Sequence, residues 1–353
     1  MKRVLYITNI EVPYRTRFFN LLAEQCDLTV LYERRHSANR NAHWASGENC
    51  RFRRKTLCGI PLRRESSFSL DILREVTAGY DRVIVGCYNS PAQMAAILWM
   101  RLLGIPYLLN VDGEVFLAGN SLKTRLKRFF LRGASGYLAA GEKAAETLRE
   151  IAGSAPVVPY YFSSLTRAEW EQHRLDDCPR DKTVLVVGQF LPYKGLDVAL
   201  EAARMDPDVT YRFVGMDHRT EQFRKDFPLP ENVELIPFLQ KKELEQEYRR
   251  CGMLVLPSRQ ECWGLVIPEA ASFGTPIVST WGSGAAVEFL SDHYPQYLAQ
   301  PGDSQSLLRS IQALRQSDNL FAYENFLREK ARNYTIETAV QAHMTCISRE
   351  EGS

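Results

Sequence analysis

Two glutamates, Glu261 and Glu269, stand eight residues apart in the segment 253–279, MLVLPSRQECWGLVIPEAASFGTPIVS. The apolar run 253–256 predicts a buried strand, which the following Pro-Ser pair ends. From Gly264 onward the spacing of the apolar residues predicts a short helix. One carboxylate therefore stands on the loop and the other on the helix, beyond the end of the same strand. This arrangement predicts a ligand cradle.

The expected helix start is suited to bind a phosphate. Its first N–H groups, at about 264–267, have no acceptor in a preceding turn, and the helix dipole adds partial positive charge there. Gly264 permits close approach of a ligand, and Pro268 is tolerated only in a first turn. We therefore expect the amides of Gly264 and Leu265 to bind a diphosphate. Glu269 stands about 7–8 Å further along the helix axis, where its carboxylate would accept two ribose hydroxyl groups.

The complete pattern over 257–278 is P-S-x-x-E-x-x-G-L-x-x-x-E-A-x-x-x-G-x-P-I-V. It resembles the E-x7-E signature of the retaining family 4 glycosyltransferases of GT-B fold. The resemblance implies an α/β chain with two Rossmann-like, doubly wound domains that face each other across a cleft. It implies transfer of a sugar from a nucleotide-diphosphate donor with retention at the anomeric carbon, without a metal or other cofactor. Glu261 would orient the donor sugar and Glu269 the ribose. Outside this context, two glutamates at this spacing also arise by chance.

A second stretch, VVGQFLPYKGLDVAL, resembles the family's V-G-R-x-x-x-x-K-G segment. The resemblance implies that Lys194 neutralises the donor's diphosphate and that Gly188 lines the same site, whereas a lysine at the end of such a loop is otherwise usually solvated. Gln189 stands where the family commonly has arginine. We therefore expect part of the compensating charge to come from elsewhere, for example from Arg15 or Arg259.

The resemblance also assigns a base pocket to the loop that contains Phe238. Backbone groups beside Phe238 would read the edge of a pyrimidine, which favours UDP over GDP as the nucleotide of the donor. An aromatic residue after a buried strand is also often part of the core. Core packing is therefore the alternative for this side chain.

Apolar runs alternate with helical patterns along the whole chain of 353 residues, a length that predicts about two domains. In the first half, strands are predicted at 4–8, 28–32, 83–86, 107–110 and 136–139, and helices at 15–25, 91–103, 122–131 and 143–151. In the second half, strands are predicted at 183–188, 209–215, 233–237, 253–256 and 277–279. This alternation predicts doubly wound parallel sheets, whose ligands lie beyond the carboxyl ends of the strands.

The polar segment 157–182 shows no strand period and predicts a connector between domains. We expect an acceptor-binding domain at 1–165, a linker at 166–181 and a nucleotide-sugar-binding domain at 182–333. The resemblance implies that residues 334–353 form a helix that crosses back to the first domain.

Four residues that follow strands of the first half are candidates to contact substrate. Asp112 directly follows a buried strand, at a place that resembles the position of the residue near the reacting sugar in family 4; it would otherwise cap the next segment. Glu114 is the second choice for this role. Tyr14 and Arg15 stand at a helix start, where they would meet the acceptor or a phosphate, or form a solvated first turn.

Positive charge is concentrated in the first half of the chain. Residues 1–165 hold 23 Lys and Arg against 14 Asp and Glu, while the remainder hold 21 against 28. Residues 115–141 include no acidic side chain. The segment Leu122–Arg132 interleaves basic and apolar residues at helical spacing: Lys123, Arg125, Lys127, Arg128 and Arg132 with Leu122, Leu126, Phe129 and Phe130. This pattern predicts a helix that rests on an anionic membrane surface, or one whose apolar face packs on the sheet.

Composition and motifs exclude several classes of protein. A hydrophobic content of 45% and a charged content of 24% are those of a globular protein. No apolar run is long enough to span a bilayer and the N-terminus enters a strand directly, which predicts a cytoplasmic protein that is at most peripheral on the inner face of the membrane. The eight cysteines show no C-x-x-C and no zinc spacing with His, which predicts reduced thiols and no metal. The loop 9–15 lacks G-x-G-x-x-G, which disfavours NAD.

Three functions remain open at this point. The first is a retaining glycosyltransferase that acts on a hydroxyl acceptor, with a lipid-linked saccharide as the expected acceptor and no nucleic acid partner. The N-terminal ITNIEVPYRTRFFNLL resembles enzymes that assemble bacterial surface polysaccharides or glycolipids. The second is a nucleotide-sugar epimerase of the same architecture, and the third is a non-catalytic, membrane-bound interaction protein.

Overall fold

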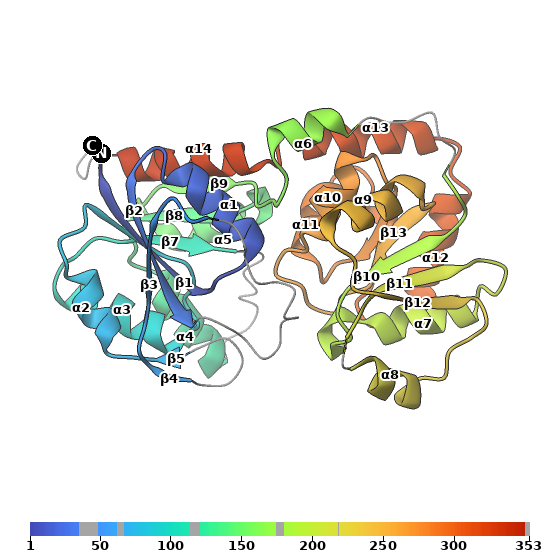
Figure 1. Ribbon diagram of the computed structural model, residues 1–353, viewed down its shortest axis with the longest axis horizontal. Coiled ribbons are helices and arrows are strands. Elements are labelled where there is room, and N and C mark those ends of the chain that lie inside the picture. Colours follow the sequence, from blue (N-terminus) through green and yellow to red (C-terminus); the bar gives the residue numbers. More distant parts are fainter. Residues whose placement is uncertain (35–48, 62–66, 113–120, 174–179, 218, 350–353) are drawn as a thin grey trace. The chain divides into compact units, whose positions relative to one another are not determined.

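The computed structural model divides the chain into two compact units, each built on one parallel sheet (Figure 1). Unit 1 comprises Met1–Ser164 and Ile336–Ser353, and unit 2 comprises Leu165–Thr335. The structure describes residues 1–34, 49–61, 67–112, 121–173, 180–217 and 219–349. Residues 174–179 of the expected linker and the candidate Glu114 lie outside the described residues.

Unit 1 contains a seven-stranded sheet in the order β3-β2-β1-β6-β7-β8-β9, and all neighbours in it are parallel. The strands are β1 (Arg3–Ile10), β2 (Asp27–Arg34), β3 (Arg53–Thr56), β6 (Arg82–Val85), β7 (Leu108–Val111), β8 (Gly136–Ala140) and β9 (Val157–Tyr160). The helices are α1 (Pro13–Leu22), α2 (Asp71–Val76), α3 (Pro91–Leu102), α4 (Leu122–Leu131), α5 (Glu142–Ala152) and α14 (Ile336–Ser348). A short antiparallel pair joins β4 (Ile60–Pro61) to β5 (Ser67–Phe68). The strand order reverses between β1 and β6.

Unit 2 contains a six-stranded parallel sheet in the order β12-β11-β10-β13-β14-β15. The strands are β10 (Val184–Val187), β11 (Tyr211–Met216), β12 (Val233–Pro237), β13 (Met253–Leu256), β14 (Ile277–Thr280) and β15 (Leu298–Ala299). The helices are α6 (Arg167–Gln172), α7 (Leu196–Arg204), α8 (Thr220–Asp226), α9 (Lys241–Arg250), α10 (Val266–Ser272), α11 (Gly284–Leu290), α12 (Ser304–Arg315) and α13 (Leu320–Ala331), with 3-10 turns at Pro192–Lys194 and Pro295–Tyr297. Here the order reverses between β10 and β13, the strand-order switch at which such sheets bind ligands.

The predicted fold class is confirmed, because both sheets are parallel and their strands alternate with helices. All four residues of β13 are buried, as are the four residues of β7. Parallel strands are covered on both faces, so their sequences are continuous apolar runs rather than alternating ones. This burial is what made the strands recognisable in the sequence.

The predicted start of the connector at residue 157 is wrong, because β9 occupies Val157–Tyr160. The strand includes Pro159, and it pairs only with β8 at the edge of the sheet. Proline removes a backbone donor, which an edge strand tolerates because one of its sides has no partner strand. The segment therefore lacks a strand pattern in sequence and still adds a strand to the sheet.

Helix α14 completes unit 1 from the far end of the chain. It packs on α1, β8 and β9. The His343 ring lies 4.7 Å from the ring centre of Phe18 and 4.9 Å from that of Tyr160. At the other end of the helix, Lys2 Nζ donates to the carbonyl of Ile347 at 2.9 Å. The helix thus forms part of the core of unit 1 rather than an appendage.

Among the described residues, no helix combines the length and the apolar character needed to cross a bilayer.

Two buried histidines predict a loss of stability in mild acid. Burial lowers the pKa of His343 in unit 1, and that of His173 in unit 2, to about 4. Unfolding returns each ring to a pKa of 6.5, so the unfolded chain binds more protons below that pH. The free energy of unfolding should therefore hold above pH 6.5 and fall toward pH 4, by up to about 1.4 kcal/mol per pH unit for each histidine.

Urea unfolding at a series of pH values between 7.5 and 5 measures this slope. His343→Gln should make the slope shallower whatever its effect on stability at neutral pH. His293→Gln, at an exposed position, serves as the matched control and should leave the slope unchanged. An unaltered slope in His343→Gln would contradict the prediction.

Candidate functional site

Three loops of unit 2 meet at the carboxyl edge of its sheet, where the strand order reverses. The loop after β13 binds the loop after β10, because the Arg259 N–H donates to the Tyr193 carbonyl at 2.8 Å. It also binds the loop after β14: the Glu261 N–H donates to the Gly282 carbonyl at 2.7 Å, and the Gly284 N–H donates to the Glu261 carbonyl at 3.1 Å. The backbone of Glu261 is therefore fixed from both sides.

Gly195 allows the closest of these approaches. Its φ is +68°, and a Cβ at this position would lie 2.1 Å from the Pro257 carbonyl oxygen. Any side chain here would push the loop after β10 away from the loop after β13. Lys194, the preceding residue, ends the 3-10 turn Pro192–Lys194, so this glycine sets the distance between Lys194 and the loop that carries Glu261.

The structure brings the two predicted residues Lys194 and Glu261 together. The Lys194 ammonium forms an ion pair with the Glu261 carboxylate, and the side chains are 20% and 16% exposed, respectively. An ammonium and a carboxylate held side by side in this way present one cationic donor and one anionic acceptor to the same ligand. A phosphate would bind the ammonium, and a hydroxyl group would donate to the carboxylate.

The helix start differs by two residues from the predicted one. Helix α10 begins at Val266, and the Ile267 N–H donates to the Gly264 carbonyl at 3.0 Å, so the expectation that Ile267 offers a free amide is wrong. In the described part of the chain, no atom accepts from the N–H groups of Gly264 or Leu265. These two amides remain the ones suited to an anion.

Gly264 adjoins the other site residues. Its φ is +101°, and a Cβ built there would lie 3.2 Å from Ser283 Oγ and 3.4 Å from Glu261 Cγ. Both the backbone conformation and the available space therefore require glycine. The amides at the start of α10 and the Glu261 side chain consequently share one small region.

Glu269 lies on α10, and its carboxylate accepts a hydrogen bond from the Tyr248 hydroxyl at 3.2 Å. Tyr248 is on α9 and is fully buried. Burial raises the pKa of this tyrosine well above its ordinary value, and the neighbouring Glu269 carboxylate raises it further. The hydroxyl is therefore a neutral donor that orients Glu269, a half-buried residue, while the carboxylate retains capacity to accept from a ligand.

Gly188 also adjoins the site, because a Cβ at this position would lie 4.0 Å from Lys194 Cδ. The Gly188 N–H donates to the Val214 carbonyl at 3.0 Å, and the Gln189 carbonyl accepts from the Leu191 N–H at 2.7 Å. Phe238 follows the edge strand β12 and is half-buried. Both the base pocket and partial core packing stay open for this side chain.

Arg259 does not supply the charge missing at Gln189. Its guanidinium binds both carboxylate oxygens of Asp197, at 2.7 and 2.6 Å, and the Pro192 carbonyl at 2.8 Å. The Arg259 side chain is only slightly buried, so the hydrogen bond to Asp197 outweighs the effect of burial and raises the pKa of Arg259. Since Asp197 balances this charge, the expectation that Arg259 compensates for Gln189 is not supported by the geometry.

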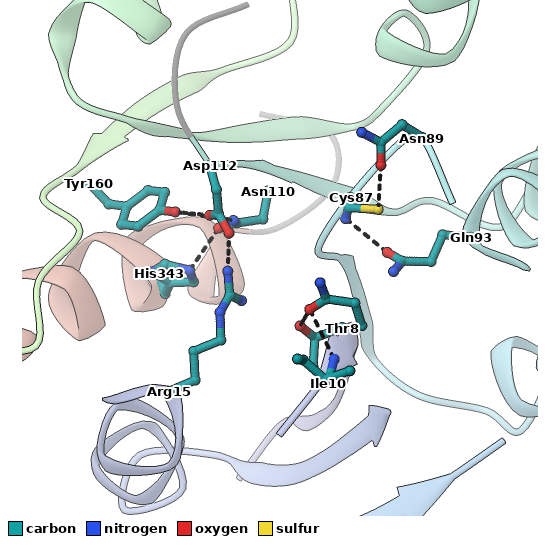
Figure 2. Close-up of polar contacts among 11 residues, drawn as sticks. Thr8, Ile10, Arg15, Cys87, Asn89, Gln93, Asn110, Asp112, Tyr160 and His343 are labelled. Carbon is teal, nitrogen blue, oxygen red and sulfur yellow. Dashed lines mark hydrogen bonds and ion pairs between the residues drawn. The ribbon is translucent and has the colours of Figure 1, made fainter. Parts of the chain in front are cut away.

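Unit 1 has a second polar centre at the carboxyl edge of its own sheet, which Figure 2 shows. Asp112 follows β7, and its carboxylate accepts from Arg15 of α1 and from the Tyr160 hydroxyl at the end of β9. Arg15 is only 11% exposed, so the alternative of a solvated first turn is wrong for this residue. Tyr14 packs edge-on against Phe162 at 5.6 Å between ring centres. The two predicted residues Arg15 and Asp112 therefore form one half-buried ion pair.

Three residues that hold this pair were not predicted. The Asn110 amide donates to Asp112 and lies 3.2 Å from the Tyr160 hydroxyl. His343 of α14 lies 3.1 Å from Asn110 Oδ1 through Nε2, while Nδ1 donates to the Ala339 carbonyl at 2.7 Å. Asn110 offered a usable signal, since it is a polar residue in the buried run LLNV, and such groups need partners. His343 and Tyr160 offered none, because only the tertiary fold brings them there.

A further polar cluster follows β6 and includes Glu33 of β2, and Figure 2 draws part of it. The Cys87 N–H donates to Gln93 Oε1 at 2.8 Å, and its thiol donates to Asn89 Oδ1 at 3.1 Å. Gln93 and Ser90 in turn bind the buried Glu33 carboxylate at 2.7 and 2.6 Å. Burial raises the pKa of Cys87 to about 11, so its thiol stays protonated at neutral pH.

Helix α4 buries a different face from the one its apolar residues suggested. Leu122, Leu126 and Phe129 are 81%, 50% and 51% exposed, and only Phe130 of the predicted apolar stripe is buried, together with Thr124 and Leu131. The interpretation that the whole stripe packs on the sheet is therefore wrong. Three large apolar side chains face solvent beside the arginines of the same helix.

Among the residues that the structure describes, no group of three His, Cys, Asp or Glu side chains is arranged to hold a metal ion.

Comparison with known proteins identifies the family of the second half of the chain. Residues 171–337 match the model of the glycosyl transferases group 1 family. This region belongs to the group 1 glycosyl transferases. Among curated relatives, an uncharacterized glycosyltransferase of Methanocaldococcus jannaschii is 30% identical over 139 residues, 38% of this chain and 39% of that protein. A D-inositol 3-phosphate glycosyltransferase of Mycobacterium sp. strain KMS is 30% identical over 117 residues, 31% of this chain and 27% of that protein. The alignments thus span well under half the length of these relatives.

Similarity to solved structures covers nearly the whole chain. Anabaena HepE, solved in complex with UDP, superposes with a TM-score of 0.70 at 15% identity and covers 98% of this chain and 99% of its own. WaaG, a glycosyltransferase involved in lipopolysaccharide biosynthesis, superposes with a TM-score of 0.64 at 15% identity and covers 98% of this chain and 100% of its own. At this identity the similarity establishes the fold, which is GT-B as predicted.

Asn110→Leu should destabilise unit 1. The change keeps a similar volume but removes the amide that donates to Asp112 and adjoins His343, and leaving buried polar groups without partners costs about 1–3 kcal/mol. Urea unfolding at pH 7.5 gives the difference in the free energy of unfolding. Asn319→Leu is the matched control, because Asn319 is exposed and makes no side-chain cap bond. Equal stability of the two variants would contradict the assigned role of Asn110.

Proposed function

We propose that the chain transfers a sugar from a nucleotide-diphosphate sugar to a hydroxyl acceptor, with retention at the anomeric carbon. The observation that carries the proposal is the ion pair between Lys194 and Glu261 beside the amides of Gly264 and Leu265. These groups come from loops after β10 and β13, the strands between which the order reverses. The match of residues 171–337 to the group 1 glycosyl transferases supports the same assignment.

Each group of the site has a task in this reaction. Lys194 and the amides at the start of α10 would stabilise the negative charge that develops on the departing nucleoside diphosphate. Glu261 would accept hydrogen bonds from hydroxyl groups of the donor sugar and so fix the sugar for attack. The departing phosphate would take the proton of the acceptor hydroxyl on the face that it leaves, which yields retention. We expect Asp112 to contact the sugar or the acceptor.

UDP is the nucleotide that we propose for the donor. HepE, which shares the fold, has been solved with UDP and with UDP-glucose. In this chain, the half-buried Phe238 stands beside backbone groups after β12, which would read the edge of a uracil. We expect Gly188 and Gln189 to line the same nucleotide site.

Glu269→Ala should weaken the binding of UDP by about 10- to 100-fold, because a carboxylate that accepts ribose hydroxyl groups contributes about 1.5–3 kcal/mol. Isothermal titration calorimetry with UDP measures the change. Glu329→Ala is the control, since Glu329 is an exposed glutamate of α13 in the same unit, and it should leave the affinity for UDP unchanged. If Glu269→Ala retains full affinity for UDP, the ribose role is wrong.

Assays of nucleotide-sugar consumption and nucleotide binding distinguish a transferase from the two alternative functions. A transferase consumes UDP-sugar only when an acceptor is present, and Lys194→Met should slow that consumption by about 10²–10³-fold. An epimerase would convert the nucleotide sugar without any acceptor. Failure of the wild-type chain to bind any nucleoside diphosphate would favour a non-catalytic interaction protein.

We also propose that α4 rests on an anionic membrane surface and that the acceptor is a lipid-linked saccharide of a surface polysaccharide or glycolipid. The exposed Leu122, Leu126 and Phe129 support this, since each would enter the lipid interface. The basic residues of the same helix would add about 1 kcal/mol each near anionic headgroups. The enzyme would then act as a peripheral protein on the cytoplasmic face of a membrane.

Replacing the three exposed apolar residues of α4 with serine should weaken binding to anionic vesicles by at least tenfold, because their insertion buries apolar surface worth more than about 1.4 kcal/mol. Cosedimentation with phosphatidylglycerol-containing vesicles measures the binding. The control carries Leu320→Ser and Phe321→Ser on α13, which are also exposed apolar residues. Similar binding by the α4 variant and the control would exclude α4 as the membrane contact.

A further inference from the structure

An arginine-lined pocket opens at the carboxyl end of α4, away from the polar centre around Asp112. Its volume is about 690 Å³. The walls carry four guanidinium groups and one aromatic ring: Arg101, Arg125, Arg128, Phe129, Arg132 and Gly133. None of these residues takes part in the proposed transfer reaction.

Arg101 fixes the shape of this pocket. From α3, its Nη2 donates to the carbonyl of Phe129 at 3.1 Å, and to that of Arg132. Its Nε donates to the Tyr107 hydroxyl at 3.0 Å. The guanidinium thus ties the last turn of α4 to α3. Because the last carbonyls of a helix carry partial negative charge, they offset part of the charge of Arg101.

The charges of Arg125 and Arg132 have no carboxylate beside them among the described residues, where none lies within 4.0 Å of either side chain. The sequence from 115 to 141 includes no acidic residue. Guanidinium groups gathered without carboxylates favour an anionic ligand, and phosphate is the anion that they bind in bidentate geometry.

Exposed apolar side chains stand on both helices that carry residues of the pocket, α3 and α4. On α4, Phe129 lies at the wall and Leu126 stands one turn before it, both about half exposed. On α3, Leu98 stands one turn before Arg101 and Leu102 directly after it, and they are 46% and 73% exposed. A free sugar phosphate or a nucleic acid would gain nothing from these apolar side chains. A lipid does, because its phosphate would enter the pocket while its chains stay among the leucines.

We propose that this pocket binds the phosphomonoester headgroup of an anionic membrane lipid. A phosphomonoester presents three terminal oxygens and a charge of about −1.5 to −2 at neutral pH, whereas a phosphodiester presents two such oxygens and a single charge. Several converging guanidinium groups match the monoester better. The inference rests on the proposed membrane contact of α4, and it adds a headgroup preference that surface charge alone does not give.

Cosedimentation with two vesicle compositions tests the preference. One contains phosphatidic acid and the other phosphatidylglycerol, each in phosphatidylcholine and adjusted to the same zeta potential. The wild-type protein should bind phosphatidic acid vesicles at least about tenfold more tightly, as one additional charged hydrogen bond would give. The double variant Arg125→Gln, Arg132→Gln should bind both compositions equally.

Lys127→Gln is the matched control, because it removes a positive charge from α4 without altering the lining of the pocket. It should weaken binding to both compositions and keep the preference. Both arginines are exposed, and circular dichroism would verify that the variants are folded.

Equal binding of the wild-type protein to both compositions would exclude the pocket as a headgroup site and leave the proposed membrane contact of α4 intact. A preference that survives in the double variant would also exclude the pocket. Absence of binding to either vesicle would overturn the pocket together with the proposed membrane contact.

Discussion

The close approach of two loops at the carboxyl edge of the unit 2 sheet is the constraint on which the candidate site depends. Gly195 lies against the Pro257 carbonyl, where no other residue fits. Parallel pairing of β10 with β13 sets the two loops side by side, and this contact then sets how far apart Lys194 and Glu261 stand. The ion pair is a consequence of backbone geometry, so it is available before any ligand arrives, and a ligand meets preorganised charges.

The two units share one arrangement of strands but carry different side chains at the same edge of the sheet. In each, the strand order reverses near the middle of a parallel sheet, and polar residues gather beyond the carboxyl ends. Unit 2 pairs Lys194 with Glu261 there, whereas unit 1 pairs Arg15 with Asp112. Neither pair joins neighbours in sequence. Parallel sheets make this possible, since every strand delivers its loop to the same edge.

Local patterns in the sequence predicted the strands and several site residues. Side chains whose hydrogen-bond partners are distant in sequence could not be predicted in this way. Apolar runs identified β13 and most other strands because burial on both faces leaves a continuous signature. One motif identified Glu261 and a second, separate motif identified Lys194, but neither predicted that the two side chains would touch. Asn110 could have been found as a polar residue within a buried strand. His343 could not, because its position beside Asn110 depends on α14 packing against a sheet more than 200 residues earlier in the chain.

The discontinuity of unit 1 affects how the chain acquires its structure during synthesis. Unit 2, Leu165–Thr335, leaves the ribosome as one uninterrupted stretch and can fold when its last strand and helices emerge. The sheet of unit 1 is made first, yet Tyr6, Phe18 and Tyr160 lack their contacts with His343 until α14 appears. The usual order, in which the N-terminal domain finishes first, is therefore reversed. For that interval the nascent protein would expose an aromatic surface, a natural target for a chaperone.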